Sequence, residues 1–222
     1  MLKIGTRCYE LVRAHSGFFL ELDPAMQPEP MQQWRLEAHF VSSPANALLP
    51  VEDDVEYLRL TVTADRYRIS DWRELTGLGL EAKDDDEEDS RTFYGEGILE
   101  YMLGPEREPL DEPPAFPLIV GDMEVKRKEG YLFSCEFDAT VKFDDGRREE
   151  LSLEAELPFA GVSMDVPING NAVAIALARA RREIGPMEIA DGRVIAHDWR
   201  LKERPEAWVD STRRVLLRTP WW

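Results

Sequence analysis

The stretch LFSCEFDATVKFDDGRREELSLEAEL, residues 132–157, alternates apolar and polar side chains at a period of two. Successive side chains of a β-strand point to opposite faces of a sheet, so this period predicts two extended strands. Each strand has one apolar set that would face a core: Phe133, Cys135, Phe137, Ala139, Val141 and Phe143 in the first, and Leu151, Leu153, Ala155, Leu157 and Phe159 in the second. The polar sets, which include Glu136, Asp138, Glu154 and Glu156, would face the other way.

The turn between these two strands can be chosen by testing the register. A three-residue loop, Asp144-Asp145-Gly146, pairs Ala139 with Leu151 and Phe137 with Leu153, so that apolar residues face apolar residues. A two-residue loop would place an apolar side chain opposite a glutamate. The longer loop also puts Gly146 where such loops require a left-handed backbone conformation. We therefore predict the three-residue loop.

Similar Gly-containing turns are predicted on either side of this hairpin. Upstream, the turn Lys128-Glu129-Gly130 would set Val125 opposite Phe133 and Met123 opposite Cys135, which completes an antiparallel meander from Pro117 to Phe159. Downstream, a turn at Ala190-Asp191-Gly192 would set Met187 opposite Ile195.

The remaining elements are predicted from their own local patterns. Five further strands are expected, at residues 8–12, 18–22, 34–41, 57–64 and 93–103. A short capped helical turn is expected at 70–75, and one amphipathic helix at 172–184, with Asn171 as N-cap and Gly185 as its stop. A weaker helix is expected at 206–217.

These elements predict an α+β fold that is predominantly β. The antiparallel meander fits either a sandwich or a partly open barrel, because alternation does not specify strand order. The segment GPEREPLDEPPAFP, residues 104–117, contains five prolines and is not expected to form a regular element. We expect one β-rich domain over residues 1–222, the alternative being two domains, 1–103 and 118–222, joined by this segment.

The charge of the chain limits its partners. With 44 acidic and 27 basic residues, the net charge is -17, which argues against binding nucleic acid or an anionic membrane through bulk electrostatics. We find no signal peptide and no apolar run long enough to span a bilayer, and we expect a cytoplasmic, bacterial protein. Residues 171–222 carry ten Arg and Lys against seven Asp and Glu, and we expect this basic part to pack across acidic sheets.

The densest run of charge is KDDDEEDSR at residues 83–91. It has neither the alternating ligands nor the glycine of a calcium loop, so no metal site is predicted there. Such runs are usually solvated loops. The functional hypothesis for this run is contact with a basic protein partner through Asp84, Asp85, Asp86, Glu87, Glu88 and Asp89.

Catalytic motifs are absent from the sequence, which contains no nucleophile elbow, Walker loop or GxGxxG followed by a helix. The two cysteines form no CxxC, and the three histidines have no metal-ligand spacing, so no cofactor is predicted. The weak candidates for general acid or base catalysis are His197, His39 and Glu37.

Two functions of different classes follow from these observations. The first, which we favour, is a non-catalytic acidic interaction module that docks or neutralises a basic protein through complementary charge. The second is an enzyme or small-ligand binder with a site in a barrel mouth or inter-sheet cleft near His197. The terminal Trp221 and Trp222 are expected to dock on the body of the protein or on a second subunit.

Overall fold

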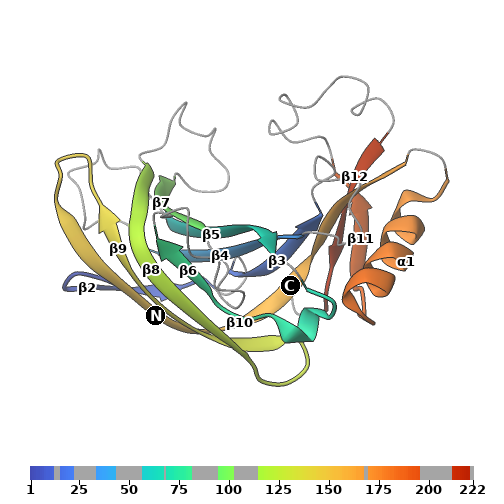
Figure 1. Ribbon diagram of the computed structural model, residues 1–222, viewed down its shortest axis with the longest axis horizontal. Coiled ribbons are helices and arrows are strands. Elements are labelled where there is room, and N and C mark those ends of the chain that lie inside the picture. Colours follow the sequence, from blue (N-terminus) through green and yellow to red (C-terminus); the bar gives the residue numbers. More distant parts are fainter. Residues whose placement is uncertain are drawn as a thin grey trace, which may run out of the picture.

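The computed structural model describes residues 1–12, 16–22, 34–43, 57–67, 69–81, 95–102, 115–167, 170–195 and 212–220 (Figure 1). These residues form one α-helix, one short 3-10 helix and twelve strands. The elements are β1 (Leu2–Ile4), β2 (Arg7–Leu11), β3 (Gly17–Leu22), β4 (Trp34–Ser43), β5 (Tyr57–Tyr67), η3 (Trp72–Glu74), β6 (Leu78–Glu81), β7 (Glu96–Met102), β8 (Ala115–Arg127), β9 (Leu132–Lys142), β10 (Arg148–Pro167), α1 (Ala172–Ile184), β11 (Asp191–Val194) and β12 (Thr212–Arg218). The predominantly β fold with one clear helix is as the sequence predicts.

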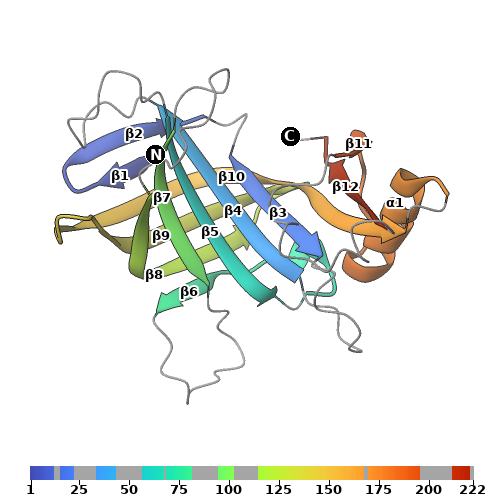
Figure 2. The ribbon, with the colours of Figure 1, turned by 90° about the horizontal axis from the view of Figure 1, so that it is seen from above.

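The strands pair into a sheet that closes on itself. Neighbours run in the order β1-β2-β4-β5-β7-β8-β9-β10, and β10 then pairs with β1 through Leu151 to Leu153. β3 also belongs to the ring. It pairs antiparallel with β4 on one side and parallel with β10 on the other. Seen from above in Figure 2, β3, β4, β5 and β7 lie over β8, β9 and β10. Of the two architectures left open by the sequence, the structure therefore has the barrel-like one.

The β9–β10 hairpin confirms the predicted register. Ala139 faces Leu151 and Phe137 faces Leu153, and the loop closes with hydrogen bonds from Phe143 N to Arg147 O and from Gly146 N to Phe143 O. Gly146 has a φ of 82°, in the left-handed region that favours glycine. The alternation of burial along β9 follows the same pattern, with Phe133, Phe137 and Val141 fully or almost fully buried.

The β8–β9 turn lies one residue later in the chain than predicted, so the predicted register of this hairpin is wrong. The turn residues are Glu129, Gly130 and Tyr131, and Val125 faces Cys135 instead of Phe133. The reason is tertiary, because the ring of Tyr131 is buried against Trp72 and is thereby held in the turn. The shift moves each pair by two residues, so the buried face of β8 stays buried.

Trp72 closes one end of the ring of strands. Its ring stacks on Tyr131 and on Phe159, with centroid distances of 4.5 Å and 5.3 Å. Its Nε1 donates a 3.0 Å hydrogen bond to the carbonyl of Pro186. The predicted helical turn is confirmed as η3, with the side chain of Asp71 accepting from Arg73 N. This turn places the indole of Trp72 in the core.

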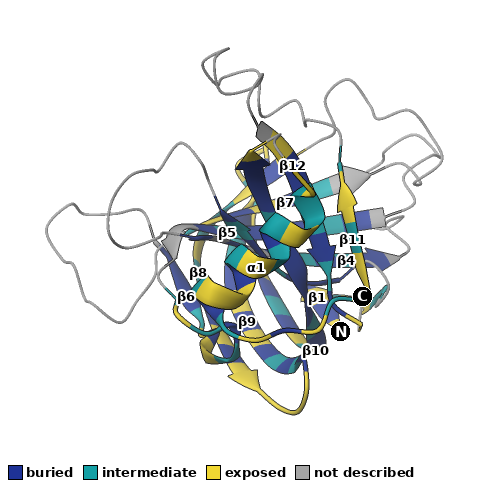
Figure 3. Cartoon of the chain, turned by 90° about the vertical axis from the view of Figure 1, so that its right-hand side faces the viewer, coloured by how far each residue is buried: buried dark blue, intermediate teal, exposed yellow. Residues whose placement is uncertain are grey.

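The helix α1 is confirmed over its predicted residues. Asn171 Oδ1 accepts a 3.4 Å hydrogen bond from Ala174 N, and Gly185 ends the helix with a φ of 86°. Figure 3 shows that one side of α1 is exposed while the other turns to the sheet, where Ala176, Ala180 and Ile184 are buried.

Other predictions for the C-terminal part are wrong. Residues 212–218 form β12, which pairs with β10 from Gly161 to Pro167, instead of continuing a helix from residue 206. The turn at 190–192 does not form, because residues 191–194 pair with β12 as β11. The last three residues of the proline-rich segment, Ala115 to Pro117, belong to β8 and pair with β7.

A buried ionic cluster joins β12 to β3 across β10. The guanidinium of Arg214 donates from Nε to Ser163 Oγ at 2.8 Å and forms ion pairs with Glu21 and Asp165. The side chains of Arg214 and Asp165 are 8% and 2% exposed. Desolvation lowers the pKa of Arg214 to about 10. The cluster connects the C-terminal strands to the rest of the sheet.

Among the described residues, no helix is both long and apolar enough to cross a bilayer.

Candidate functional site

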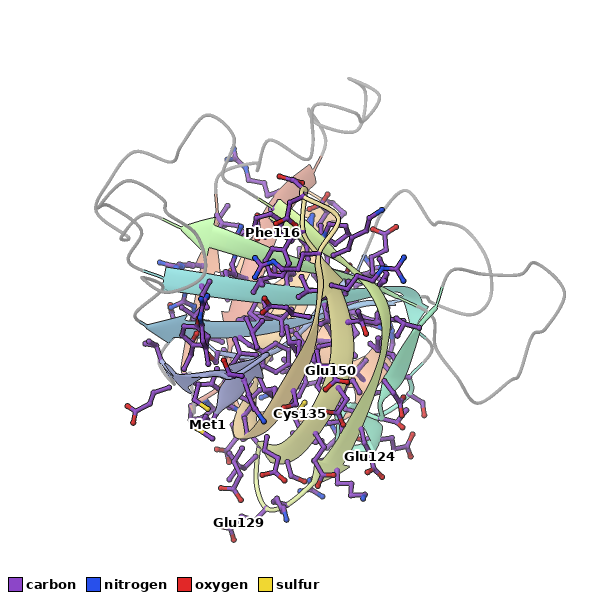
Figure 4. All side chains as sticks on the ribbon, turned by 90° about the vertical axis from the view of Figure 1, so that its left-hand side faces the viewer. Met1, Phe116, Glu124, Glu129, Cys135 and Glu150 are labelled. Atoms are coloured by element: carbon purple, nitrogen blue, oxygen red, sulfur yellow. The ribbon has the colours of Figure 1, made fainter. Side chains whose placement is uncertain are left out.

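The outer face of β1, β8, β9 and β10 brings acidic side chains from distant parts of the chain into rows. In one row Glu136 of β9 has Glu124 of β8 on one side and Glu154 of β10 on the other. In the next row Asp122 faces Asp138. We call the outward carboxylates of these strands the acidic face: Asp122, Glu124, Glu136, Asp138, Glu150, Glu154 and Glu156, all exposed. Figure 4 views this side of the molecule with Glu124 and Glu150 labelled.

Like charges directly opposite one another destabilise a sheet. Few basic side chains offset them on this face. Lys126 forms a 2.7 Å ion pair with Glu124, but both groups are more than half exposed, so the pair contributes little. Lys3 lies opposite Ser152, beside the aspartate row, and Lys142 faces Arg148 at one end. The acidic face therefore keeps a large excess of negative charge.

A groove of about 600 Å³ lies within the acidic face. Its lining comes from four strands and includes Asp122, Asp138, Glu150, Lys3, Thr140 and Val120. Val120 is 43% exposed and supplies apolar surface among the carboxylates. The groove thus combines negative charge with a small apolar surface, which suits the aliphatic stem and charged end of a lysine or arginine.

The described C-terminal elements leave the acidic face open. Among the described residues of the basic part, β12 pairs with residues 161–167 of β10 and α1 packs beside it, so they do not cover this face. The carboxylates of β10 on the acidic face lie earlier, at residues 150–156. In the described part of the chain, no group of three or more His, Cys, Asp or Glu is arranged to hold a metal ion.

The predicted site residues are only partly within the structure. The acidic run from Asp84 to Asp89 and the candidate base His197 lie outside the described residues, and so do Trp221 and Trp222. The roles predicted for these residues therefore stay predictions.

His39 and Glu37 occupy positions on β4, two residues apart. His39 is half-buried, and its ring meets Phe19 edge-on with centroids 5.5 Å apart. The neighbouring Phe40 is fully buried, so His39 faces outward from the ring of strands. Glu37 pairs through its backbone with Phe19 and Thr63. The described contacts of His39 are those of a packed side chain on the outer surface.

The two cysteines occupy different environments. Cys8 is exposed, on the outer surface opposite Lys3, whereas Cys135 is buried on the core side of β9. Burial, with a smaller effect of Glu136, raises the pKa of Cys135 to about 12, so this thiol is not an activated nucleophile.

Comparison with protein-family models, curated proteins and solved structures finds no match for this chain.

An acidic row follows from the sequence in either register of β8 and β9. The register expected from the sequence sets Asp122 beside Glu136, whereas the observed register sets Glu124 there and pairs Asp122 with Asp138. Glu154 lies beside Glu136 in both cases. Aligning the outward carboxylates of all three strands would have been the signal to follow.

Proposed function

We propose that the protein is a non-catalytic interaction module whose acidic face docks a basic protein partner. The observation that supports the proposal is the row Glu124–Glu136–Glu154, in which three carboxylates lie side by side on adjacent strands. Their mutual repulsion is relieved when cationic side chains approach. A surface of this kind accelerates encounter with a basic partner and disfavours acidic ones.

The form of the face favours a protein partner over a single metal ion. The carboxylates are spread along three strands instead of converging, as the described residues include no group of metal-binding geometry. A partner with several lysines or arginines can place one charge at each row. The groove beside Val120 would take one of these side chains along its length.

The acidic run of residues 84–89 and a cytoplasmic location belong to the same proposal. The overall charge of -17 extends the field beyond the acidic face.

The experiment compares two variants of equal charge in capture from native lysate. In the face variant, Glu136→Gln with Asp138→Asn, two carboxylates at the centre of the acidic face become amides. In the control variant, Glu188→Gln with Asp191→Asn, two exposed carboxylates away from the face are changed in the same way. Retained proteins are identified by mass spectrometry at low and high salt.

We expect basic proteins to be retained at low salt by the wild type and the control variant and lost from the face variant. The face variant should fold, because neutralising adjacent like charges stabilises a sheet. Equal retention by both variants would refute the role of this face, and retention of proteins without basic character would refute the electrostatic basis.

A further inference from the structure

The end of the ring opposite Trp72 contains polar side chains that face inward. The turn between β1 and β2 and the turn between β9 and β10 lie at this end (Figures 1 and 2). On β2, Arg7 and Tyr9 lie opposite Ile4 and Leu2, both fully buried, so all four share the core side of the sheet. An arginine is rarely placed on the core side unless it is paired.

Arg7 and Tyr9 present donors without acceptors. Arg7 Nη1 and Tyr9 Oη are both buried, and neither makes a hydrogen bond of good geometry within the described part of the chain. Tyr9 is only 4% exposed, while Arg7 is half-buried. The two side chains lie near each other: burial raises the pKa of Tyr9, while the charge of Arg7 and a side-chain hydrogen bond with it act to lower that pKa. Buried donors are normally satisfied, so this pair requires an explanation.

The nearby carboxylate is already engaged elsewhere. Glu149, which faces inward from β10, forms an ion pair with Arg147 through Oε1, and its Oε2 lies against Gly5. The guanidinium of Arg147 also covers the ring of Phe143 at 4.4 Å from its centroid. Arg147 also forms a 3.6 Å ion pair with Asp145 in the β9–β10 turn, so both carboxylates are held by Arg147, and among the described residues neither pairs with the Arg7 guanidinium.

This end is reachable from solvent. The side chains of Arg147 and Glu149 are 38% and 20% exposed, whereas the opposite end is filled by the stacked rings of Trp72, Tyr131 and Phe159. A guanidinium with a free N–H and a phenol hydroxyl both suit the oxygens of an anion.

We propose that Arg7 and Tyr9 form a binding site for a small oxyanion, a carboxylate or a phosphate group, at the open end of the ring. The guanidinium supplies the charge and one donor, and the Tyr9 hydroxyl supplies a second donor. Arg147 borders the site from the β9–β10 turn, where Glu149 and Asp145 hold its guanidinium. This site is separate from the acidic face and does not depend on the proposed protein partner.

The test is a thermal-unfolding titration with sodium phosphate and, separately, sodium citrate, at an ionic strength held constant with sodium chloride. A ligand that binds only the folded state raises Tm with concentration. Both anions stabilise folded proteins in general, so we expect a saturable rise in the wild type and only a smaller, non-saturating rise in Arg7→Met, which removes the charge. Tyr9→Phe should need about three- to tenfold more anion for the same rise, since it loses one hydrogen bond.

Two controls separate this site from general effects of charge. Arg148→Met removes an exposed, outward arginine from β10 and should respond like the wild type. The face variant of the preceding section should also respond like the wild type, so the two proposals can fail independently. A response to only one of the two anions would identify a phosphate or a carboxylate ligand.

The proposal is overturned if neither anion raises the wild-type Tm beyond the sodium chloride control, or if Arg7→Met responds as strongly as the wild type. If Arg7→Met does not unfold cooperatively, the titration is repeated with two milder variants. Arg7→Lys keeps the charge but loses the planar guanidinium, and Tyr9→Phe removes only a hydroxyl. Unchanged affinity in both of these variants would equally overturn the proposal.

Discussion

Trp72 stacks on Tyr131 with ring centroids 4.5 Å apart and an interplanar angle of 11°. One ring comes from η3 and the other from the β8–β9 turn, so the contact joins segments that are distant in the sequence. The guanidinium of Arg73 lies 4.7 Å from the centroid of the same indole. The stack seals one end of the ring and holds the turn in the register observed.

We expect Trp72→Ala to lower the free energy of unfolding by about 3–5 kcal/mol, because it empties a buried site and removes the hydrogen bond to Pro186. Tyr131→Phe keeps the ring and loses only the hydroxyl that accepts from Glu188 N, so about 1 kcal/mol is expected. Urea denaturation measures both. Similar losses for the two variants would show that stacking is not the main contribution.

Arg214→Ala should lower the free energy of unfolding by about 3–5 kcal/mol, because Glu21 and Asp165 would lose a buried partner. Arg213→Ala, at the exposed neighbouring position of β12, serves as control and should change it by about 0.5 kcal/mol or less. A loss for Arg214→Ala no larger than that for Arg213→Ala would contradict the role of charge in this cluster.

The two thiols should differ in reactivity and in their effect on stability. A thiol reagent at pH 8 should modify Cys8 in the native protein and reach Cys135 only after denaturation. The folded-state pKa of Cys135 is raised to about 12, above the ordinary value of 9.0. Its contribution to stability is therefore fully present below pH 9 and is lost as pH rises towards 12, by up to about 4 kcal/mol.

That loss is measured as the difference between wild type and Cys135→Ala in denaturation at pH 8 and pH 10.5, with Cys8→Ala as the matched control. The destabilising effect of Cys135→Ala should be smaller at the higher pH. An effect that is the same at both pH values would exclude a raised pKa for Cys135.

Glu136→Gln should raise the free energy of unfolding by about 0.2–1 kcal/mol for each like-charged neighbour that it relieves, Glu124 and Glu154. The gain should shrink in high salt, because the repulsion between exposed charges is screened. Glu188→Gln, away from the acidic face, should show no such gain. A destabilised Glu136→Gln would mean that the carboxylate makes a favourable contact on this surface.

Some of the fold was predictable because its determinants are local. The β9–β10 register follows from the alternation on both strands together with Gly146, since a slip of one residue would expose a whole apolar set. The helix α1 begins after Asn171, whose side chain accepts a hydrogen bond from the backbone of the first turn, and it ends at Gly185.

Other elements were decided by partners far away in the chain. TRRVLLR at residues 212–218 carries a pattern compatible with a helix or a strand, and it becomes β12 because β10 offers a free edge from Gly161 to Pro167. The β8–β9 turn is set by Tyr131 packing on Trp72, a contact that no local pattern contains.

By itself the sequence determined the amount of β-structure, the central hairpin, the helix and the excess of negative charge. These depend on side-chain period, capping residues and composition, all of which act within a few residues. Only the tertiary structure decided that β10 pairs with β1 to close the ring, that three glutamates lie in one row, and that Arg7 and Tyr9 face the core side together. Each of these depends on the pairing of strands across the chain, where the packing of buried side chains selects one register among several with the same local pattern.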